Sequence, residues 1–219
     1  MLTTRFKINY SIGAIANGIK TDAFTFFLLF FYSRVIGLDP LLASSAIALA
    51  LIIDSITDPL MGAISDRTKT RFGRRHPYML VSFIPITFFY ILLFSPQESW
   101  ELSQNQLFWW MFLCATFTRI GITLFEVPHR SFGAEISNDY HERTKLFSWR
   151  ELFAWTAGIS NAFFAYFVFF RSTPEYPQGQ LNPEAYFDLA LLGGFVMAVS
   201  IIFSTISTRN EVNNLSSWK

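Results

Sequence analysis

The sequence predicts an all-α membrane protein with six transmembrane helices arranged as two three-helix repeats. Of its 219 residues, 52% are hydrophobic and only 15% are charged, against about 25% charged residues in an ordinary soluble domain. Long apolar segments recur between short polar breaks, as membrane-spanning helices require. Ionisable residues lie inside the first two segments of each predicted repeat and are missing from the centre of the third.

The six predicted helices follow one another with short connections. They cover residues 9–34, 40–64, 77–95, 105–132, 146–170 and 187–207. The breaks between them fall at residues 37–40, the basic loop 65–76, residues 95–98, the polar run 137–145 and the Pro/Gly-rich run 172–183. The first segment is long, carries Lys20 and Asp22, and lacks a small-residue cleavage site, which argues against a secretory signal.

Charged residues lie well inside four of the six segments. In helix order they are Lys20 and Asp22; Asp54 and Asp58; Arg119, Glu126 and Arg130; and Arg150 and Glu151. The third and sixth segments carry none in their central parts. This order indicates two three-helix units in which the first and second helices line a polar interior and the third faces lipid. Such repeats are common in secondary transporters.

Lysine and arginine residues outside the segments or at their ends favour one side of the membrane. The residues on that side are Arg5, Lys7, Arg67, Lys69, Arg71, Arg74, Arg75, Arg143, Lys145, Arg209 and Lys219. Only Arg34 and Arg171 fall on the other side. The positive-inside rule therefore predicts that both termini are cytoplasmic. We expect a multi-pass protein of the cytoplasmic (inner) membrane. Residues 1–208 would form the bundle, and residues 209–219 would begin a cytoplasmic linker.

Several function classes are disfavoured by composition. The formal net charge of +1 creates no overall field that would attract nucleic acid. The single Cys114 excludes an internal disulfide and has no metal-type spacing around it. His76, His129 and His141 do not form the grouping that a metal enzyme or a Ser/His hydrolase needs. We therefore predict a protein that is not an enzyme and has no cofactor.

Asp54 and Asp58 form a pair of carboxylates on one face of the second helix, about 5–6 Å apart at Cβ. Inserting two central Asp residues into the membrane costs about 5–7 kcal/mol, and the Leu and Ile residues of this helix offset about 3–6 kcal/mol of that cost. A hard cation such as Na⁺ between the carboxylates would relieve their repulsion. Thr57 and Thr123 could add oxygen ligands. The alternative is that both Asp residues form ion pairs, with Arg150 and Lys20, that hold helices together.

Glu126 lies two residues before Pro128, which interrupts the hydrogen-bond ladder of the fourth helix and frees backbone carbonyls. Two interpretations stay open: an internal pair with Arg130 in a kinked helix, or a carboxylate that accepts hydrogen bonds from substrate hydroxyls. Arg150 in the fifth helix could hold hydroxyls in a bidentate manner or pair with one of the helix 2 carboxylates.

The loop between the second and third helices reads SDRTKTRFGRRHP. Its simplest interpretation is a topology signal. Its order indicates more: Asp66 precedes Arg67, Gly73 suits a tight turn, and Arg74 and Arg75 open the next helix. We predict a short fixed turn whose ion pairs can break and re-form, as a gate at the inner mouth would require.

The segment DSITDPLMGAISDRTKTRFGRRHP, residues 54–77, resembles the glycoside–pentoside–hexuronide:cation symporters, a branch of the major facilitator superfamily. Weaker similarity covers YSRVIGL at 32–38, EVP at 126–128 and Arg150. The resemblance implies twelve helices in two six-helix bundles, alternating access, and uptake of a sugar coupled to Na⁺, H⁺ or Li⁺. Since 219 residues accommodate six spans, we expect an N-terminal half or a natural truncation. Such a bundle would need a C-terminal bundle or a second copy as partner.

The resemblance also implies roles for individual residues. The coupling cation would bind Asp54 and Asp58, with Thr123 as an additional ligand. The solute would contact Glu126 and Arg150.

Two positions depart from the family pattern. Gly18 stands where the family has an acidic sugar ligand in helix 1, and the nearest acid is Asp22. Arg130 replaces the aromatic residue that follows the helix 4 proline. Together with Lys20 and Arg119, Arg130 would suit an anionic substrate such as a hexuronide.

Two alternatives to sugar symport therefore stay open. One is a carrier for a non-sugar anionic or lipid-like solute, because related carriers move lysophospholipids. The other is a six-helix membrane receptor or assembly partner that transports nothing.

Overall fold

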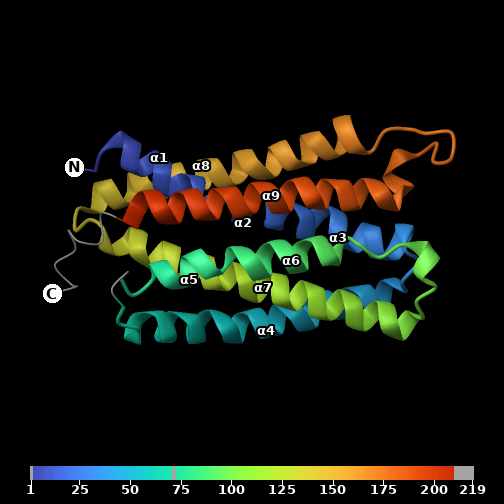
Figure 1. The fold of residues 1–219 in the computed structure, drawn as a ribbon, viewed down its shortest axis with the longest axis horizontal. Coiled ribbons are helices and arrows are strands. Elements are labelled where there is room, and N and C mark those ends of the chain that lie inside the picture. Colours follow the sequence, from blue (N-terminus) through green and yellow to red (C-terminus); the bar gives the residue numbers. More distant parts are fainter. Residues whose placement is uncertain (1, 71–72, 210–219) are drawn as a thin grey trace.

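The computed structural model describes residues 2–70 and 73–209 as a bundle of long helices that run along a common axis (Figure 1). Within these described ranges, six helical spans are long and apolar enough to cross a membrane: Thr4–Val35, Pro40–Arg67, His76–Leu93, Gln104–Glu135, Tyr140–Phe169 and Pro183–Thr208. The described residues include no strand. The predicted all-α class and the number of spans are confirmed. Arg71, Lys219 and predicted linker residues 210–219 lie outside the described residues.

The first span is interrupted rather than uniform. It comprises α1 (Thr4–Ile12), α2 (Ala14–Asp22), the π-helical turn Ala23–Phe27, α3 (Leu28–Phe30) and a second π-helical turn, Phe31–Val35. Single π-helical turns change the direction of the following side chains and are frequent at functional sites. Asp22 lies directly before the first of these turns.

The other spans are more regular. They are α4 (Pro40–Arg67), α5 (His76–Val81) with α6 (Phe83–Leu93), α7 (Gln104–Glu135), α8 (Tyr140–Phe164) with the π-helical turn Ala165–Phe169, and α9 (Pro183–Thr208). Short 3₁₀ turns at Glu98–Trp100 and Gly179–Leu181 lie in the connections. Pro59 and Pro128 are accommodated inside α4 and α7, so the proline in α7 does not end the helix.

Polar caps determine where four of the long helices begin. The side chains of Asp39, Ser103, Asp139 and Asn182 each accept a hydrogen bond from a backbone N–H in the first turn of α4, α7, α8 and α9. These residue types are the preferred N-caps because they satisfy amide donors that the helix itself leaves free.

The packing order shows the two predicted repeats. α2, in the first span, packs against α8 and α9, whereas α7, in the fourth span, packs against α4 and α6. The first helix of each repeat therefore contacts the second and third helices of the other repeat. The two third helices, α6 and α9, pack against each other and lie side by side in Figure 1.

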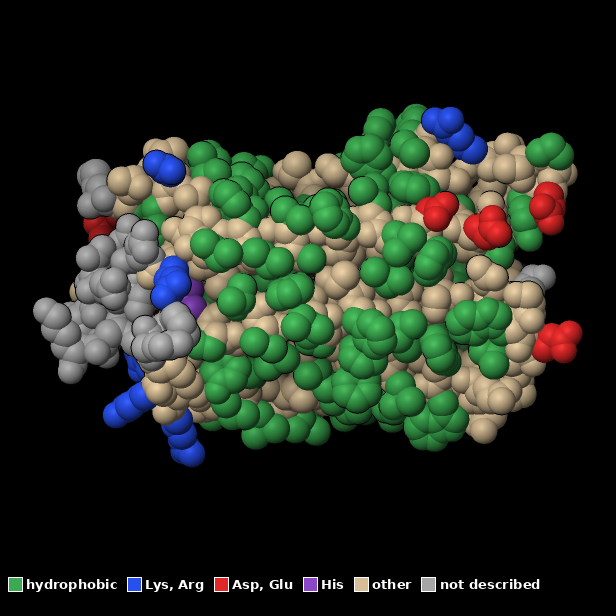
Figure 2. Space-filling view, in the orientation of Figure 1, with side chains coloured by type: hydrophobic (Ala, Val, Ile, Leu, Met, Phe, Trp, Pro, Cys, Tyr) green, Lys and Arg blue, Asp and Glu red, His purple; other side chains and the backbone are tan. Residues whose placement is uncertain are grey.

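The surface suits a lipid environment. Large apolar side chains are exposed on several helices, including Leu51, Ile52 and Ile56 on α4, Trp155 on α8 and Phe195 on α9. Figure 2 shows hydrophobic side chains across the middle of one face, with charged side chains toward the two ends. Because α1 begins, α4 ends, α8 begins and α9 ends at the left end of Figure 1, the described basic loop segments all lie at that end.

Gly18 lies at a close contact between α2 and α8. A Cβ added at Gly18 would stand 2.0 Å from the carbonyl oxygen of Ala154, and Gly158 also faces the Gly18 backbone. Small residues at such contacts let membrane helices pack tightly. The resemblance aligns Gly18 with a family position that contacts sugar, and in this structure Gly18 lies in a helix–helix contact.

Gly18→Ala is therefore expected to lower the free energy of unfolding by about 1–3 kcal/mol, because the added methyl overpacks the contact with α8. Gly62→Ala is the matched control, since its Cβ would meet only the Val127 side chain at 3.7 Å. In a helix interior, Ala is favoured over Gly by about 1 kcal/mol, so the control is expected to keep or raise the unfolding temperature. Equal unfolding temperatures of the two purified variants in detergent would contradict the assignment.

Candidate cation and solute site

Asp54, Asp58 and Thr123 bring three oxygen atoms together across α4 and α7. The Thr123 Oγ1 lies 2.7 Å from Asp58 Oδ1 and 3.2 Å from Asp54 Oδ1. A hydroxyl has one proton to donate, so it can serve only one of the two carboxylates at a time. We call these three side chains the oxygen cluster. Thr57, the other predicted ligand, instead donates its hydroxyl to the backbone carbonyl of Asp54 at 3.1 Å.

The ligand set of the oxygen cluster is two carboxylates and one hydroxyl. In the described part of the chain, no group of three or more His, Cys, Asp or Glu residues is arranged to hold a metal ion. Hard cations prefer such oxygen ligands, whereas zinc and copper favour imidazole or thiolate. The donor chemistry therefore suits Na⁺ or Li⁺ better than a transition metal.

Asp54 has an ion-pair partner that differs from the predicted ones. Arg119 Nη1 donates to Asp54 Oδ2 at 2.7 Å, and the Arg119 guanidinium lies 5.0 Å from the centre of the Phe24 ring. The ion-pair interpretation named Arg150 and Lys20 as partners. Arg150 instead pairs elsewhere, and Lys20 makes no hydrogen bond or ion pair with a described residue, although it interacts electrostatically with Asp54 and Arg119.

Glu126 lies in a second charged group that joins α7 and α8. Its Oε1 accepts hydrogen bonds from Arg150 Nη2 and, at 2.7 Å, from Arg130 Nε. Arg150 also donates from Nη1 to Glu151. The Arg150 side chain is only 1% exposed, whereas that of Arg130 is 55% exposed. We call Glu126, Arg130, Arg150 and Glu151 the Glu126 cluster.

The Glu126 cluster keeps some polar atoms available. Glu126 Oε2 and Arg150 Nε are buried and have no hydrogen-bond partner among the described residues. Unpaired buried polar atoms cost free energy unless water or a ligand bonds to them. The internal Glu126–Arg130 pair and a solute contact are therefore compatible here, because only one carboxylate oxygen takes part in the pair.

Asp22 lies apart from both clusters. It is buried, and its Oδ2 accepts a hydrogen bond from Asn161 Nδ2 on α8 at 2.7 Å. Sequence reasoning did not consider Asn161, because an amide inside an apolar helix gives no charge signal. The structure thus places Asp22 in the contact between α2 and α8, beside Gly158.

A buried aromatic stack joins α7 to α1 beside Pro128. The His129 ring lies 4.0 Å from the Tyr10 ring and 4.8 Å from the Phe125 ring, nearly parallel to both. His129 Nε2 is 3.0 Å from the Tyr10 carbonyl, and the Tyr10 hydroxyl donates to the His129 carbonyl at 3.0 Å. Since a carbonyl only accepts, His129 carries its proton on Nε2.

The basic loop forms ion pairs at the end of the bundle where α4 ends. Buried Arg75 Nη2 donates to Asp66 Oδ1 and to Glu135 Oε1, both at 2.8 Å, and Arg74 lies 3.5 Å from Glu135. Gly73 has a φ of +93°, which fits the predicted tight turn. Arg67 is exposed. Glu135, at the end of α7, was not among the predicted gate residues because nothing in the local pattern links it to this loop.

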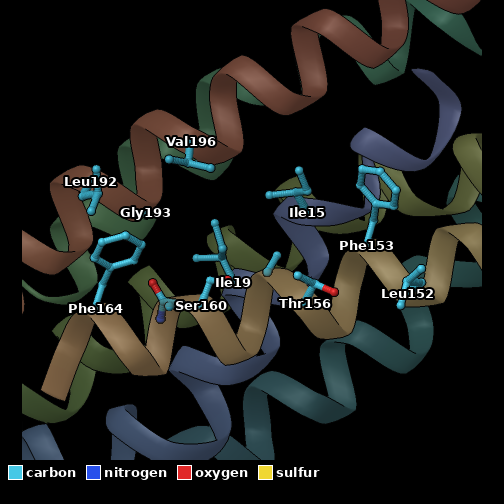
Figure 3. Close-up of a pocket in the computed structure, with 12 residues that line it drawn as sticks. Ile15, Ile19, Leu152, Phe153, Thr156, Ser160, Phe164, Leu192, Gly193 and Val196 are labelled. Carbon is cyan, nitrogen blue, oxygen red and sulfur yellow. The ribbon is translucent and has the colours of Figure 1, made fainter. Parts of the chain in front are cut away.

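A cavity of about 660 Å³ lies between α2, α8 and α9. Figure 3 shows Ile19, Ser160, Phe164 and Leu192 along its walls. None of its described lining residues is charged, and Asn161, the partner of Asp22, is the most polar of them. The cavity is therefore not the place where the charged site residues meet.

A family model described as MFS/sugar transport protein matches residues 9–217, which is nearly the whole chain. The chain belongs to this family. Membership in the MFS/sugar transport protein family agrees with the six membrane-spanning helices of the structure. It also bears out the family resemblance drawn from residues 54–77.

Curated relatives are symporters by name. The chain is 34% identical over 181 residues to an uncharacterized symporter of Synechocystis, covering 80% of this chain and 33% of the relative. It is 34% identical over 152 residues to a putative glycoside/cation symporter of Escherichia coli, covering 68% of this chain and 32% of the relative. It is 32% identical over 163 residues to the sodium-dependent lysophosphatidylcholine symporter 1-A of Danio rerio, covering 73% of this chain and 30% of the relative. The chain thus spans about a third of the length of these relatives.

Proposed function

We propose that the chain is the N-terminal six-helix bundle of a secondary active transporter that couples solute uptake to a cation. The observation that carries the proposal is the oxygen cluster. Three oxygen atoms, one each from Asp54, Asp58 and Thr123, lie together, and the Thr123 hydroxyl supplies the one proton between them. The helices that carry them are apolar enough to span a membrane. Ionisable side chains at such a depth are costly and usually mark ion or substrate paths.

Na⁺ is the cation that we favour, with H⁺ or Li⁺ as alternatives. Two carboxylates and a hydroxyl match the ligand preference of a hard cation. A relative from Danio rerio is named as sodium-dependent, which supports the same choice.

The solute site of the proposal is the Glu126 cluster together with Lys20. Arg150 and Arg130 provide guanidinium donors, and Glu126 Oε2 is an acceptor without a partner among the described residues. This mixture of donors and acceptors suits the hydroxyls of a sugar. Lys20 adds one positive charge to two arginines and two glutamates, and the resulting net charge of +1 favours a glycoside that bears an acid group. The name of the Escherichia coli relative supports a glycoside.

A second candidate solute is lipid-like. The lysophosphatidylcholine symporter of Danio rerio shares 32% identity with the chain, and a phosphate would satisfy the same guanidinium donors.

The remaining parts of the proposal concern the whole carrier. The charged residues of α4, α7 and α8 all belong to one six-helix bundle, which cannot enclose a translocation path alone. A second six-helix bundle would supply the opposite wall of the path. We place both termini and the Asp66–Arg75–Glu135 ion pairs on the cytoplasmic side of the inner membrane, following the positive-inside rule. The ion pairs would open and close the inner mouth.

Asp58→Asn is expected to lower the affinity for the coupling cation about 10- to 100-fold, because it removes a charged ligand. The complete carrier, reconstituted in liposomes, would be assayed for uptake of glycosides, hexuronides and lysophospholipids under Na⁺, Li⁺ and pH gradients. Asp39→Asn on the same helix is the matched control, since Asn caps α4 as well as Asp does. Cation-driven uptake that survives both Asp54→Asn and Asp58→Asn would contradict the cation site. A carrier that takes up nothing from the panel would favour a receptor or assembly partner.

A further inference from the structure

We propose that Arg119 is a resident counter-ion of the cation site and that its release from Asp54 links cation binding to solute binding. The inference rests on the proposed symport function and adds a residue with a specific task to it. It starts from the Arg119–Asp54 ion pair between α7 and α4.

The two oxygens of Asp54 have different neighbours. Oδ1 faces Thr123 inside the oxygen cluster, whereas Oδ2 accepts the hydrogen bond from Arg119. The guanidinium therefore does not fill the oxygen cluster. It neutralises one of the two carboxylates from the outside, which reduces the formal charge of the cation site from −2 to −1. A site with less negative charge attracts a cation more weakly.

The surroundings of Arg119 make the guanidinium releasable. Its side chain is 11% exposed, Asp54 is its single carboxylate partner among the described residues, and its Nε is buried without a hydrogen-bond partner among them. Lys20 carries the same charge and interacts electrostatically with Arg119. The Phe24 ring, 5.0 Å from the guanidinium carbon, offers a second favourable contact through its π-face.

Cation binding would shift this balance. A cation among Asp54, Asp58 and Thr123 shares the negative charge of Asp54 and so weakens its attraction for Arg119. The released guanidinium, together with Lys20, then presents positive charge to a solute that carries an anionic oxygen, in a carboxylate or a phosphate. Linkage requires that the solute strengthen cation binding by the same factor by which the cation strengthens solute binding.

A purely structural ion pair makes a different prediction. If Arg119 only held α4 to α7, its loss would lower stability and leave the intrinsic Na⁺ affinity unchanged. A resident counter-ion must instead weaken Na⁺ binding in the wild type, so its removal must strengthen that binding.

The test measures Na⁺ affinity and coupling in the complete carrier. Thermal unfolding would be followed against Na⁺ concentration without solute, and binding of a glucuronide, a lysophospholipid and a neutral glycoside would be measured with and without Na⁺. Arg119→Gln is expected to lower the half-saturating Na⁺ concentration about tenfold or more. It is also expected to abolish the mutual enhancement between Na⁺ and whichever anionic solute binds. Arg34→Gln, an exposed arginine in the first span, is expected to change neither.

Arg119→Lys keeps the charge and serves if the Gln variant does not fold. Lysine lacks the planar fork of arginine, so its Na⁺ affinity is expected to lie between those of the wild type and Arg119→Gln. A Gln variant that responds to Na⁺ when the wild type does not would also support the proposal.

Three results would overturn the inference: unchanged Na⁺ affinity in Arg119→Gln, wild-type affinity in Arg119→Lys, or no Na⁺ response in any form. If Asp58→Asn still abolishes cation-driven uptake, the symport function stands and only the role of Arg119 is wrong. If that uptake is absent or insensitive to both Asp substitutions, the proposed function itself is wrong.

Discussion

Replacing Arg150 by methionine is expected to abolish solute uptake and to lower the free energy of unfolding by about 3–5 kcal/mol. The Arg150 side chain is 1% exposed and donates hydrogen bonds to both Glu126 and Glu151. Glu126 is itself buried, and without Arg150 its one remaining cation partner among the described residues is the exposed Arg130. A carboxylate left in that position loses most of its compensation for desolvation.

A double-mutant cycle separates the structural effect from the functional one. Glu126→Gln in the Arg150→Met background removes the stranded charge, so much of the lost stability is expected to return while uptake stays absent. Lys145→Met on the same helix is the control, because this lysine is exposed and 3.6 Å from Glu142; such exposed pairs contribute about 0–1 kcal/mol. A single Arg150→Met variant as stable as the control would contradict the assignment of a buried ion pair.

Replacing His129 by alanine is expected to lower the free energy of unfolding by about 3 kcal/mol. The substitution removes a ring that stacks between Tyr10 and Phe125 and leaves the Tyr10 carbonyl without the donor at Nε2. His129→Phe keeps the stacking and loses only the hydrogen bond, so its expected loss is about 1 kcal/mol.

His141→Ala is the matched control for His129→Ala. His141 is exposed in the first turn of α8, and substitutions at such positions usually stay within about 0.5 kcal/mol. Chemical or thermal unfolding of the purified protein in detergent would measure all three variants. If His129→Ala and His141→Ala had the same effect, the stack would not be what joins α7 to α1.

The helices could be predicted because their signals are local. Apolar length, a polar cap such as Asp39 or Asn182, and a turn residue such as Gly73 act over a few residues. The spans nevertheless extend beyond several predicted ends; the first begins at Thr4 instead of residue 9. Its π-helical turns and the break at Gly13 were not predicted.

The face of α4 that carries the candidate site was predictable from spacing, and Thr123 was predicted from the family resemblance. The spacing of four residues places Asp54 and Asp58 on one face of α4, and the structure brings Thr123 of α7 to that face. The Glu126–Arg130 pair within α7 was one of the predicted alternatives, whereas the partners of Asp54 and Asp22 on neighbouring helices were not predicted. Asp54 pairs with Arg119, and Asp22 accepts from Asn161, because these contacts depend on how neighbouring helices are rotated and shifted along their axes.

The sequence by itself determined that this is a six-span helical membrane protein with carboxylates inside α4, because composition and periodicity follow from the order of residues alone. Only the tertiary structure decided which arginine pairs with which Asp or Glu side chain. An Arg side chain can reach any of several acids across a helix interface, and small differences in helix register select among them. That selection separated the oxygen cluster with Arg119 from the Glu126 cluster with Arg150.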